Sequence, residues 1–312
     1  MQRIKTDQYR NRTDSDLRKR RWGIGLAVGL FGFVALAGCS GESGSPAEAL
    51  PDSTVQVVDS TPVTDSVAEE VAAPEPFMIL VTNDDGVGAD GIDALVNALL
   101  ELDDVMVTVV APAENQSGSG GKTTDGVLEV RDATTKSGYP AKAVVGFPAD
   151  SIVWALDQGG INFMPDLVVS GINEGQNYSF EIAPISGTVG AARAAAMRNV
   201  PSVAVSQGLG EPPNYPASVE AVIAWVEANR DALQARQPGE PTPTFVSINV
   251  PTCAPGTSLR GVIEVPMGYL GTSDYNASNC ASTVTPDTDV TGFQNGYGVI
   301  TELQVDGPPF TE

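Results

Sequence analysis

From Phe77 onward, short apolar runs alternate with stretches that have the period of an amphipathic helix. Runs rich in β-branched residues and bounded by polar residues are typical of buried strands. Five such runs stand out: Phe77–Thr82, Val105–Ala111, Asp166–Ser170, Ser202–Ser206 and Phe245–Val250. We expect each of them to form a strand of one sheet.

Helical patterns separate these runs. Between the first two, the apolar residues recur at helical spacing and would share one face: Ile92, Leu95, Leu99 and Leu100. Small residues fill a second predicted helix over Gly187–Asn199, and a longer one covers Pro216–Arg236. Strands that alternate with helices predict an α/β fold, here a Rossmann-like, mostly parallel sheet with helices on both faces. A C-terminal β-rich extension completes the expected fold.

The first 76 residues have a different character. The basic run Arg18–Arg21 precedes the apolar run Gly23–Ala37, which is too short for a membrane span and fits a signal peptide. The sequence Leu36-Ala37-Gly38-Cys39 resembles a bacterial lipobox. A short uncleaved anchor is the alternative.

We therefore expect three segments. Residues 1–38 would be a lipoprotein-type signal peptide, and Cys39 would carry the lipid that attaches the protein to a membrane. Residues 39–76, rich in Ser, Pro, Asp and Glu, would be a disordered acidic linker. Residues 77–312 would form the functional domain, exported and anchored to the bacterial cell envelope.

Composition narrows the chemistry. The chain has 312 residues, no histidine and a formal net charge of −22. Such a charge repels the phosphate backbone and argues against nucleic acid as a partner. The lack of histidine excludes histidine general bases, Ser-His-Asp triads and histidine metal ligands. Carboxylates, hydroxyls, amides, Lys, Arg or an oxygen-bound metal must then do any chemistry.

Polar side chains follow several of the predicted strands. Asp84 and Asp85 follow the first strand after Asn83, Ser117 follows the second strand, and Asn173 follows the third. Ligands of such sheets bind beyond the carboxyl ends of the strands. Two adjacent carboxylates repel each other unless a cation lies between them, and these oxygen ligands suit Mg²⁺ or Mn²⁺. The alternative is that Asp84, Asp85 and Gly86 form only a turn and a helix cap.

Five segments together resemble the signatures of the SurE family of stationary-phase survival proteins. In chain order they are ILVTNDDGVGADGI, VVAPAENQSGSG, GFPADSI, PDLVVSGINEGQN and SGTVGAARAA. The resemblance implies a metal-dependent 5′/3′-nucleotidase, a phosphoric monoester hydrolase that converts nucleoside monophosphates to nucleoside and phosphate. It also implies a possible homodimer or homotetramer.

The same resemblance assigns roles to individual residues. Asp84 and Asp85 match metal ligands of the family. In a metal-dependent mechanism we further expect Asp84 to orient or deprotonate the attacking water. Ser117 and Asn173 match the other two metal ligands. Four residues match the phosphate site, namely Asn177, Ser186, Gly187 and Thr188, and a helix start favours an anion there. Asn83 and Asn115 match substrate-site positions within the same motifs.

Some positions depart from the family pattern. Gly88 stands where many members have histidine, and Phe147 stands where threonine is usual. The segment 178–185, YSFEIAPI, is longer than in common members and bears on the nucleotide preference. These departures leave open a non-catalytic, surface-anchored protein that binds a ligand or cation on the same fold. A phosphate-binding P-loop at 116–124 is disfavoured, because Gln116 stands where its first glycine is required.

Two cysteines remain once Cys39 is set aside. Cys253 and Cys280 form an even pair in a chain expected to be exported, which predicts a disulfide bond. Two free, buried thiols are the alternative.

Overall fold

The computed structural model describes residues 75–307, and the first strand, β1, lies close to the start of this part of the chain. The expected signal peptide, Cys39 and nearly all of the expected linker lie outside it. The strands are β1 Phe77–Thr82, β2 Val105–Pro112, β3 Glu129–Thr134, β4 Pro140–Val145, β5 Leu167–Glu174, β6 Ser202–Gln207, β7 Thr244–Val250, β8 Val262–Glu264 and β9 Gly298–Gln304. The helices are α1 Asp90–Leu99, α2 Pro148–Ile152, α3 Ser179–Ile182, α4 Gly187–Ala196, α5 Tyr215–Gln234 and α6 Asp289–Gln294, with a π-helical turn η1 Val153–Asp157 and a 3-10 turn η2 Ala183–Ile185.

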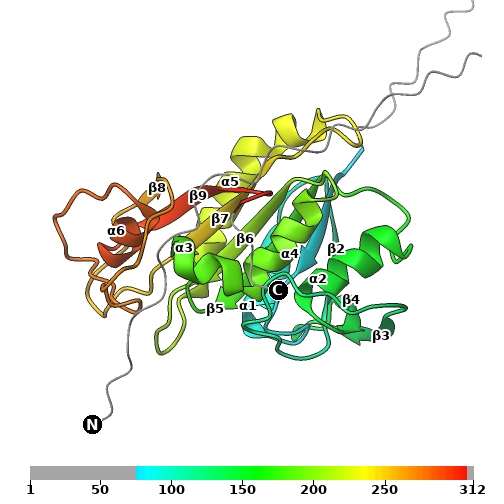
Figure 1. Cartoon of the computed structure of the whole chain (residues 1–312), viewed down its shortest axis with the longest axis horizontal. Helices are drawn as coiled ribbons and strands as arrows, with labels where there is room; N and C mark the ends of the chain where they lie inside the picture. Colours follow the sequence, from blue (N-terminus) through cyan, green and yellow to red (C-terminus); the bar gives the residue numbers. More distant parts are fainter. Residues whose placement is uncertain (1–74, 308–312) are drawn as a thin grey trace, which may run out of the picture. The chain divides into compact units, whose positions relative to one another are not determined.

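These strands form one sheet in the order β3-β4-β2-β1-β5-β6-β7-β9-β8 (Figure 1). All pairs from β4 through β7 are parallel, whereas β3 runs antiparallel to β4, and β9 antiparallel to β7. The expected mostly parallel α/β sheet is confirmed. Its topology brings the carboxyl ends of β1, β5, β6 and β7 to the same edge, where a ligand site is expected.

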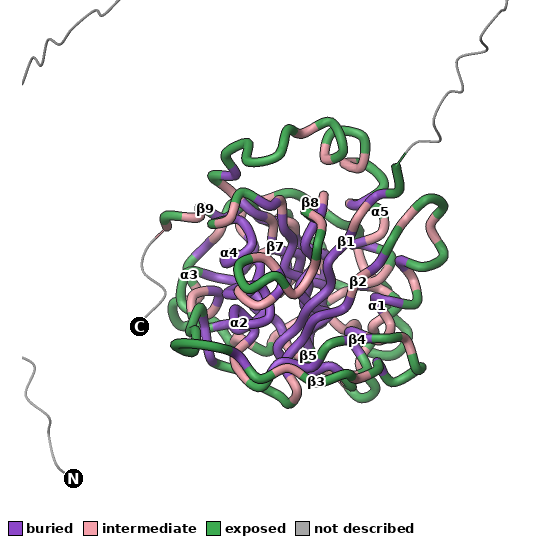
Figure 2. The backbone as a smooth tube through the Cα atoms, turned by 90° about the vertical axis from the view of Figure 1, so that its right-hand side faces the viewer, coloured by how far each residue is buried: buried purple, intermediate pink, exposed green. Residues whose placement is uncertain are grey.

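Helices cover both faces of the sheet, and the strand sequence explains why. Along β1, Ile79 and Val81 belong to one core with α1 and α5, whereas Leu80 belongs to a second core with α2 and α4. Successive side chains of a strand point to opposite faces, so a strand buried on both sides is apolar throughout. Figure 2 shows these strands as a buried centre surrounded by exposed loops.

Before α4, the predicted elements match the observed ones closely, with two corrections. Ile92, Leu95 and Leu99 are fully buried as expected, but Leu100 is 41% exposed. The reason is that α1 ends at Leu99, and Leu100 is its C-cap, where the chain leaves the helix. The other correction concerns the third predicted strand, which continues to Glu174 instead of ending at Ser170.

The sequence pattern missed strands β3 and β4. Strand β3 lies at the sheet edge, and all of its side chains are exposed or half-buried. It lacks the apolar alternation that identifies a strand, and pairing with β4 holds it in place. The C-terminal region adds β8 and β9 to the same sheet, with α6 between them. Within residues 75–307, no helix is long and apolar enough to cross a membrane.

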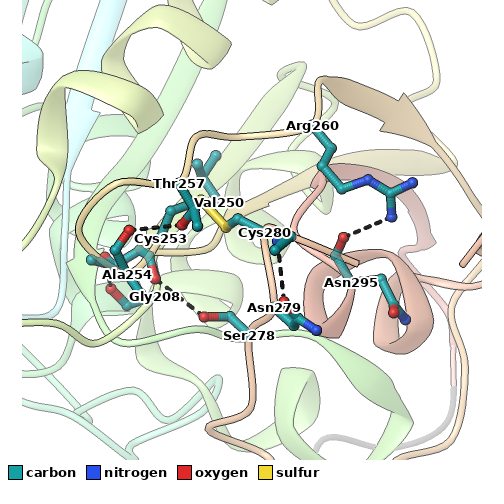
Figure 3. The surroundings of a disulfide bond; sticks show 12 residues. Gly208, Val250, Cys253, Ala254, Thr257, Arg260, Ser278, Asn279, Cys280 and Asn295 are labelled. Atoms are coloured by element: carbon teal, nitrogen blue, oxygen red, sulfur yellow. Dashed lines mark hydrogen bonds between the residues drawn. A yellow bond between two sulfur atoms is a disulfide. The ribbon is translucent and has the colours of Figure 1, made fainter. Parts of the chain in front are cut away.

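A disulfide bond joins Cys253, just after β7, to Cys280, which precedes α6 (Figure 3). Neighbouring contacts hold the same two segments together. Arg260 donates to the carbonyl of Asn295 at 3.1 Å, and Ser278 Oγ donates to the carbonyl of Thr252 at 3.1 Å. The bridge thus fastens the irregular C-terminal region to the strand that borders the site.

Reduction of this disulfide is expected to lower the free energy of unfolding by about 2–4 kcal/mol, because it frees the closed loop in the unfolded chain. The bridged residues are 27 positions apart. Denaturant unfolding of residues 75–312 with and without reductant measures the difference. The double variant Cys253→Ala/Cys280→Ala serves as the control, since reductant should not change its midpoint. Two titratable thiols in the unfolded, unreduced protein would contradict the prediction.

Candidate active site

A tight turn follows β1, and the side chain of Asn83 builds it. Its Nδ2 donates to the Gly86 carbonyl at 2.8 Å, and its Oδ1 accepts the Gly86 N–H at 3.2 Å. Gly86 has a φ of +100°, which only glycine adopts at little cost. Helix α1 has Ala89 as its N-cap and no side-chain cap. The carboxylates of Asp84 and Asp85 therefore neither stabilise the turn nor cap the helix, which argues against the turn-and-cap alternative.

Asp84 is buried beneath the start of α4. Only 2% of its surface is exposed, and its Oδ1 accepts a hydrogen bond from Thr188 Oγ1 at 2.6 Å. Burial raises the pKa of Asp84 to about 6; the Thr188 hydroxyl counteracts this rise, and the charge of Asp85 adds to it. A carboxylate is thus held in a place that disfavours its charge.

Asp85 lies beside it and is half-buried. Its Oδ1 accepts from Asn115 Nδ2 at 2.9 Å, and its Oδ2 accepts from the Glu174 N–H at 3.0 Å. Burial raises the pKa of Asp85, and the backbone hydrogen bond from Glu174 opposes that rise. Asn115 Oδ1 accepts the N–H of Ser117 at 2.9 Å, so the exposed Ser117 is linked to Asp85 through one side chain.

Asn173 comes from the neighbouring strand. It lies inside β5, not after it, and a bulge between Ser170 and Asn173 shifts the register with β6 before Asn173 pairs with Ser206. Its side chain is largely buried, and its Nδ2 donates to the Gly175 carbonyl at 2.6 Å. With that nitrogen engaged, Oδ1 is the atom of Asn173 suited to a cation.

The predicted phosphate residues converge at the start of α4. Ser186 is the N-cap, and its Oγ accepts the Val189 N–H at 3.2 Å. Gly187 and Thr188 form the first helical residues, where backbone N–H groups have no intrahelical acceptor. Asn177 Nδ2 lies 3.4 Å from Thr188 Oγ1, so this residue belongs to the same group.

Two buried residues that the sequence did not single out position Asn177. Ser206 Oγ accepts from its Nδ2 at 2.9 Å, and Asn249 Oδ1 accepts from its backbone N–H at 2.6 Å. Both lie near the carboxyl ends of their strands, β6 and β7. A polar residue at the end of an otherwise apolar strand is the signal that would have identified them.

The lengthened segment 178–185 forms α3 and η2, and the C-terminal region holds it. The buried Asp289 accepts the Ser179 N–H at 2.9 Å and the Gly268 N–H at 2.6 Å. Ser179 has a φ of +76°, a conformation that side-chain-bearing residues rarely adopt. The segment that follows Asn177 is therefore fixed from outside the α/β core.

The donor set fits a hard divalent cation. Asp84, Asp85, Ser117 and Asn173 supply two carboxylates, a hydroxyl and an amide oxygen. No lysine or arginine within residues 75–307 forms an ion pair with either aspartate. Nor does this part of the chain contain a group of three or more His, Cys, Asp or Glu side chains able to hold a metal, so a cation here depends on the neutral oxygens.

The metal-free protein is expected to lose stability as the pH rises from about 4 to 7. A carboxyl whose pKa is higher in the folded than in the unfolded chain favours folding while it is protonated. The contribution of Asp84 is complete below its unfolded pKa of 3.8 and is lost as the pH passes its folded pKa of about 6. That loss is about 3 kcal/mol.

Unfolding in chelator at several pH values, compared with Asp84→Asn, measures this effect, because the difference between the two proteins isolates the one carboxyl. Equal pH slopes would contradict the prediction.

Comparison with known proteins identifies relatives of this chain. A family model described as "Survival protein SurE" matches residues 79–270. The 5′-nucleotidase SurE of Chlorobaculum tepidum is 37% identical over 196 residues, which covers 62% of this chain and 70% of that protein. The 5′-nucleotidase SurE of Hyphomonas neptunium is 34% identical over 245 residues, which covers 73% of this chain and 93% of that protein.

The fold has a solved counterpart as well. The crystal structure of the SurE protein from Aquifex aeolicus superposes with a TM-score of 0.56 at 27% identity, covering 74% of this chain and 94% of that one. Family model, sequence relatives and fold agree. The chain belongs to the SurE family.

Proposed function

We propose that this protein is a phosphomonoesterase that hydrolyses nucleoside monophosphates, a 5′/3′-nucleotidase. Its relatives bear the name 5′-nucleotidase SurE. One observation carries the proposal: Asp84, buried at the carboxyl end of β1, accepts a hydrogen bond from Thr188 in the first turn of α4. A carboxylate that can hold a cation thus meets a helix start that favours a phosphate.

We infer that Mg²⁺ or Mn²⁺ is the cofactor, held by Asp84, Asp85, Ser117 and Asn173. When bound, such a cation polarises the phosphoryl group and lowers the pKa of a water ligand. It would also relieve the repulsion between the two aspartates, whose pKa values burial already raises.

The side chains of this protein then have separate tasks. Ser186, Gly187 and Thr188 hold the phosphate at the start of α4, and Asn177, next to Thr188, orients it. Asp84 accepts a proton from the attacking water, and the hydrogen bond from Thr188 fixes the orientation of its carboxyl group. The leaving group is the nucleoside hydroxyl, and orthophosphate is the other product.

A substrate panel tests the proposal. Residues 75–312 are assayed for phosphate release from 5′- and 3′-nucleoside monophosphates with Mg²⁺, with Mn²⁺ and with chelator. Release that requires the metal supports the nucleotidase. Binding of nucleotide without any release under every condition supports a non-catalytic binding protein instead.

We also propose that the protein is exported and lipid-anchored to the cell envelope through Cys39, which lies outside the described residues. Its surroundings in the sequence, Leu36-Ala37-Gly38-Cys39, support this proposal. Cys39→Ser is expected to block processing or to release the protein from membranes. Fractionation of cells that express each form measures the outcome. A wild-type protein found entirely in the soluble cytoplasmic fraction would refute the anchor.

A further inference from the structure

One buried hydroxyl beside the site has no use in the mechanism above. Ser119 lies in the loop between β2 and β3, two residues beyond the predicted ligand Ser117. It is 7% exposed, and its Oγ has no hydrogen-bond partner among residues 75–307. Ser117, by contrast, is exposed. A buried hydroxyl without a partner is unfavourable and needs an explanation, and a ligand that accepts its hydrogen bond provides one when the hydroxyl lies beside a binding site.

The position of Gly187 shows where the Ser119 hydroxyl points. A Cβ atom at Gly187 would lie 2.9 Å from Ser119 Oγ and 2.9 Å from Asp84 Oδ2. Both oxygens therefore lie beside the first residue of α4, on the side where a side chain is missing. The Ser119 hydroxyl therefore lies against the start of this ten-residue helix, next to the same glycine as the Asp84 carboxylate.

The loop that carries Ser119 is fixed against α4. The Gly120 N–H donates to the Ile185 carbonyl at 3.1 Å, directly before the Ser186 cap. Gly120 also packs closely against Gly190 of α4. A Cβ atom at Gly190 would lie only 2.0 Å from the Gly120 carbonyl oxygen. Ser119 is thus held in place before any ligand arrives, which lowers the entropic cost of using it.

We infer that Ser119 is a substrate-binding residue whose Oγ–H donates to a phosphoryl oxygen at the start of α4. The inference rests on the proposed function, because it names a further contact to the same phosphate. The Ser119 hydroxyl adds a neutral hydrogen-bond donor where the helix start already favours an anion. The phosphoryl oxygen in turn provides the acceptor that this buried hydroxyl lacks.

The test compares Ser119→Ala with Ser151→Ala. Ser151, in α2, is the matched control, because its hydroxyl is equally buried and equally without a partner in the described chain. Inorganic phosphate is the probe. Its dissociation constant is measured by titration calorimetry at saturating Mn²⁺, and Mn²⁺ affinity is measured separately. Melting temperatures show that each variant is folded.

Ser119→Ala is expected to bind phosphate roughly tenfold more weakly, the loss typical of one hydrogen bond to a charged group. The KM for a nucleoside monophosphate should rise by a similar factor, with kcat within about twofold of the wild type. Ser151→Ala should change neither constant. The melting temperature of Ser119→Ala should not fall, since the variant removes an unpaired buried group.

Unchanged phosphate affinity in Ser119→Ala would overturn the inference. So would weaker Mn²⁺ binding with unchanged phosphate affinity, because Ser119 would then be a cation ligand. The phosphate titration is informative even without turnover. A protein that hydrolyses no nucleotide refutes the proposed function, whereas the titration still decides the role of Ser119.

Discussion

Asp84→Asn is expected to lower phosphate release from a nucleoside monophosphate at least about 100-fold. Substituting a residue that only hydrogen-bonds to a metal ligand already lowers metal affinity or activity about 10–100-fold, and Asp84 is itself a proposed ligand. The substitution removes one of two charges that face the cation and also the group that accepts the proton of water. The asparagine amide oxygen carries no formal charge. It therefore accepts the hydrogen bond from Thr188 and binds a cation more weakly than the carboxylate does. Steady-state assays over a series of Mn²⁺ concentrations measure the loss.

Asp85→Asn provides the internal comparison. It removes one charge but leaves the proton acceptor, so added Mn²⁺ should restore its activity more fully than that of Asp84→Asn. Gly88→Ala is the neutral control in the same loop, because a Cβ there meets nothing within 4 Å. Neither aspartate variant should unfold the domain, since Asn83 builds the turn. Full activity of Asp84→Asn at limiting metal would refute the metal site.

The strands and helices that carry the site can be predicted from the sequence because they are buried, and burial requires the apolar or small residues that identify them. Strand β1 is apolar at every position except its last, Thr82, and its observed bounds are the predicted ones. Helix α4 was found from its small residues, which let it lie against the sheet; it ends at Ala196, three residues earlier than expected. Strand β3 could not be found, since an exposed edge strand depends on its partner and not on its own pattern.

The site itself was only partly visible in the sequence. Asp84 and Thr188 come together because β1 and α4 meet at one edge of the sheet, an arrangement that the alternation of strands and helices implies. The supports of Asn177 were not foreseeable in the same way. Ser206 and Asn249 reach it only because β5, β6 and β7 are neighbours, and strand order is not recorded in a local pattern.

Gly187→Ala is expected to reduce activity about 100-fold, because a displacement of about 1 Å in a reacting group can cost that much. The new Cβ would lie 2.8 Å from Asp84 Cβ and 2.9 Å from both Asp84 Oδ2 and Ser119 Oγ. Real Cβ contacts are longer, so the buried Asp84 side chain or the start of α4 must move. Either shift separates the carboxylate from the phosphate site, and both Mn²⁺ affinity and phosphate affinity should fall.

The matched control is Gly121→Ala, in the loop that faces the same helix. A Cβ at Gly121 meets nothing within 4 Å, and its backbone conformation is open to alanine. This variant should retain wild-type kinetics. Overpacking at Gly187 should destabilise the fold by only about 1–3 kcal/mol, so calorimetry can show that the protein remains folded while activity is lost. Wild-type kcat/KM in Gly187→Ala would mean that the phosphate does not bind at the start of α4, because no rearrangement that accommodates the methyl group leaves Asp84, Ser119 and the helix all in place.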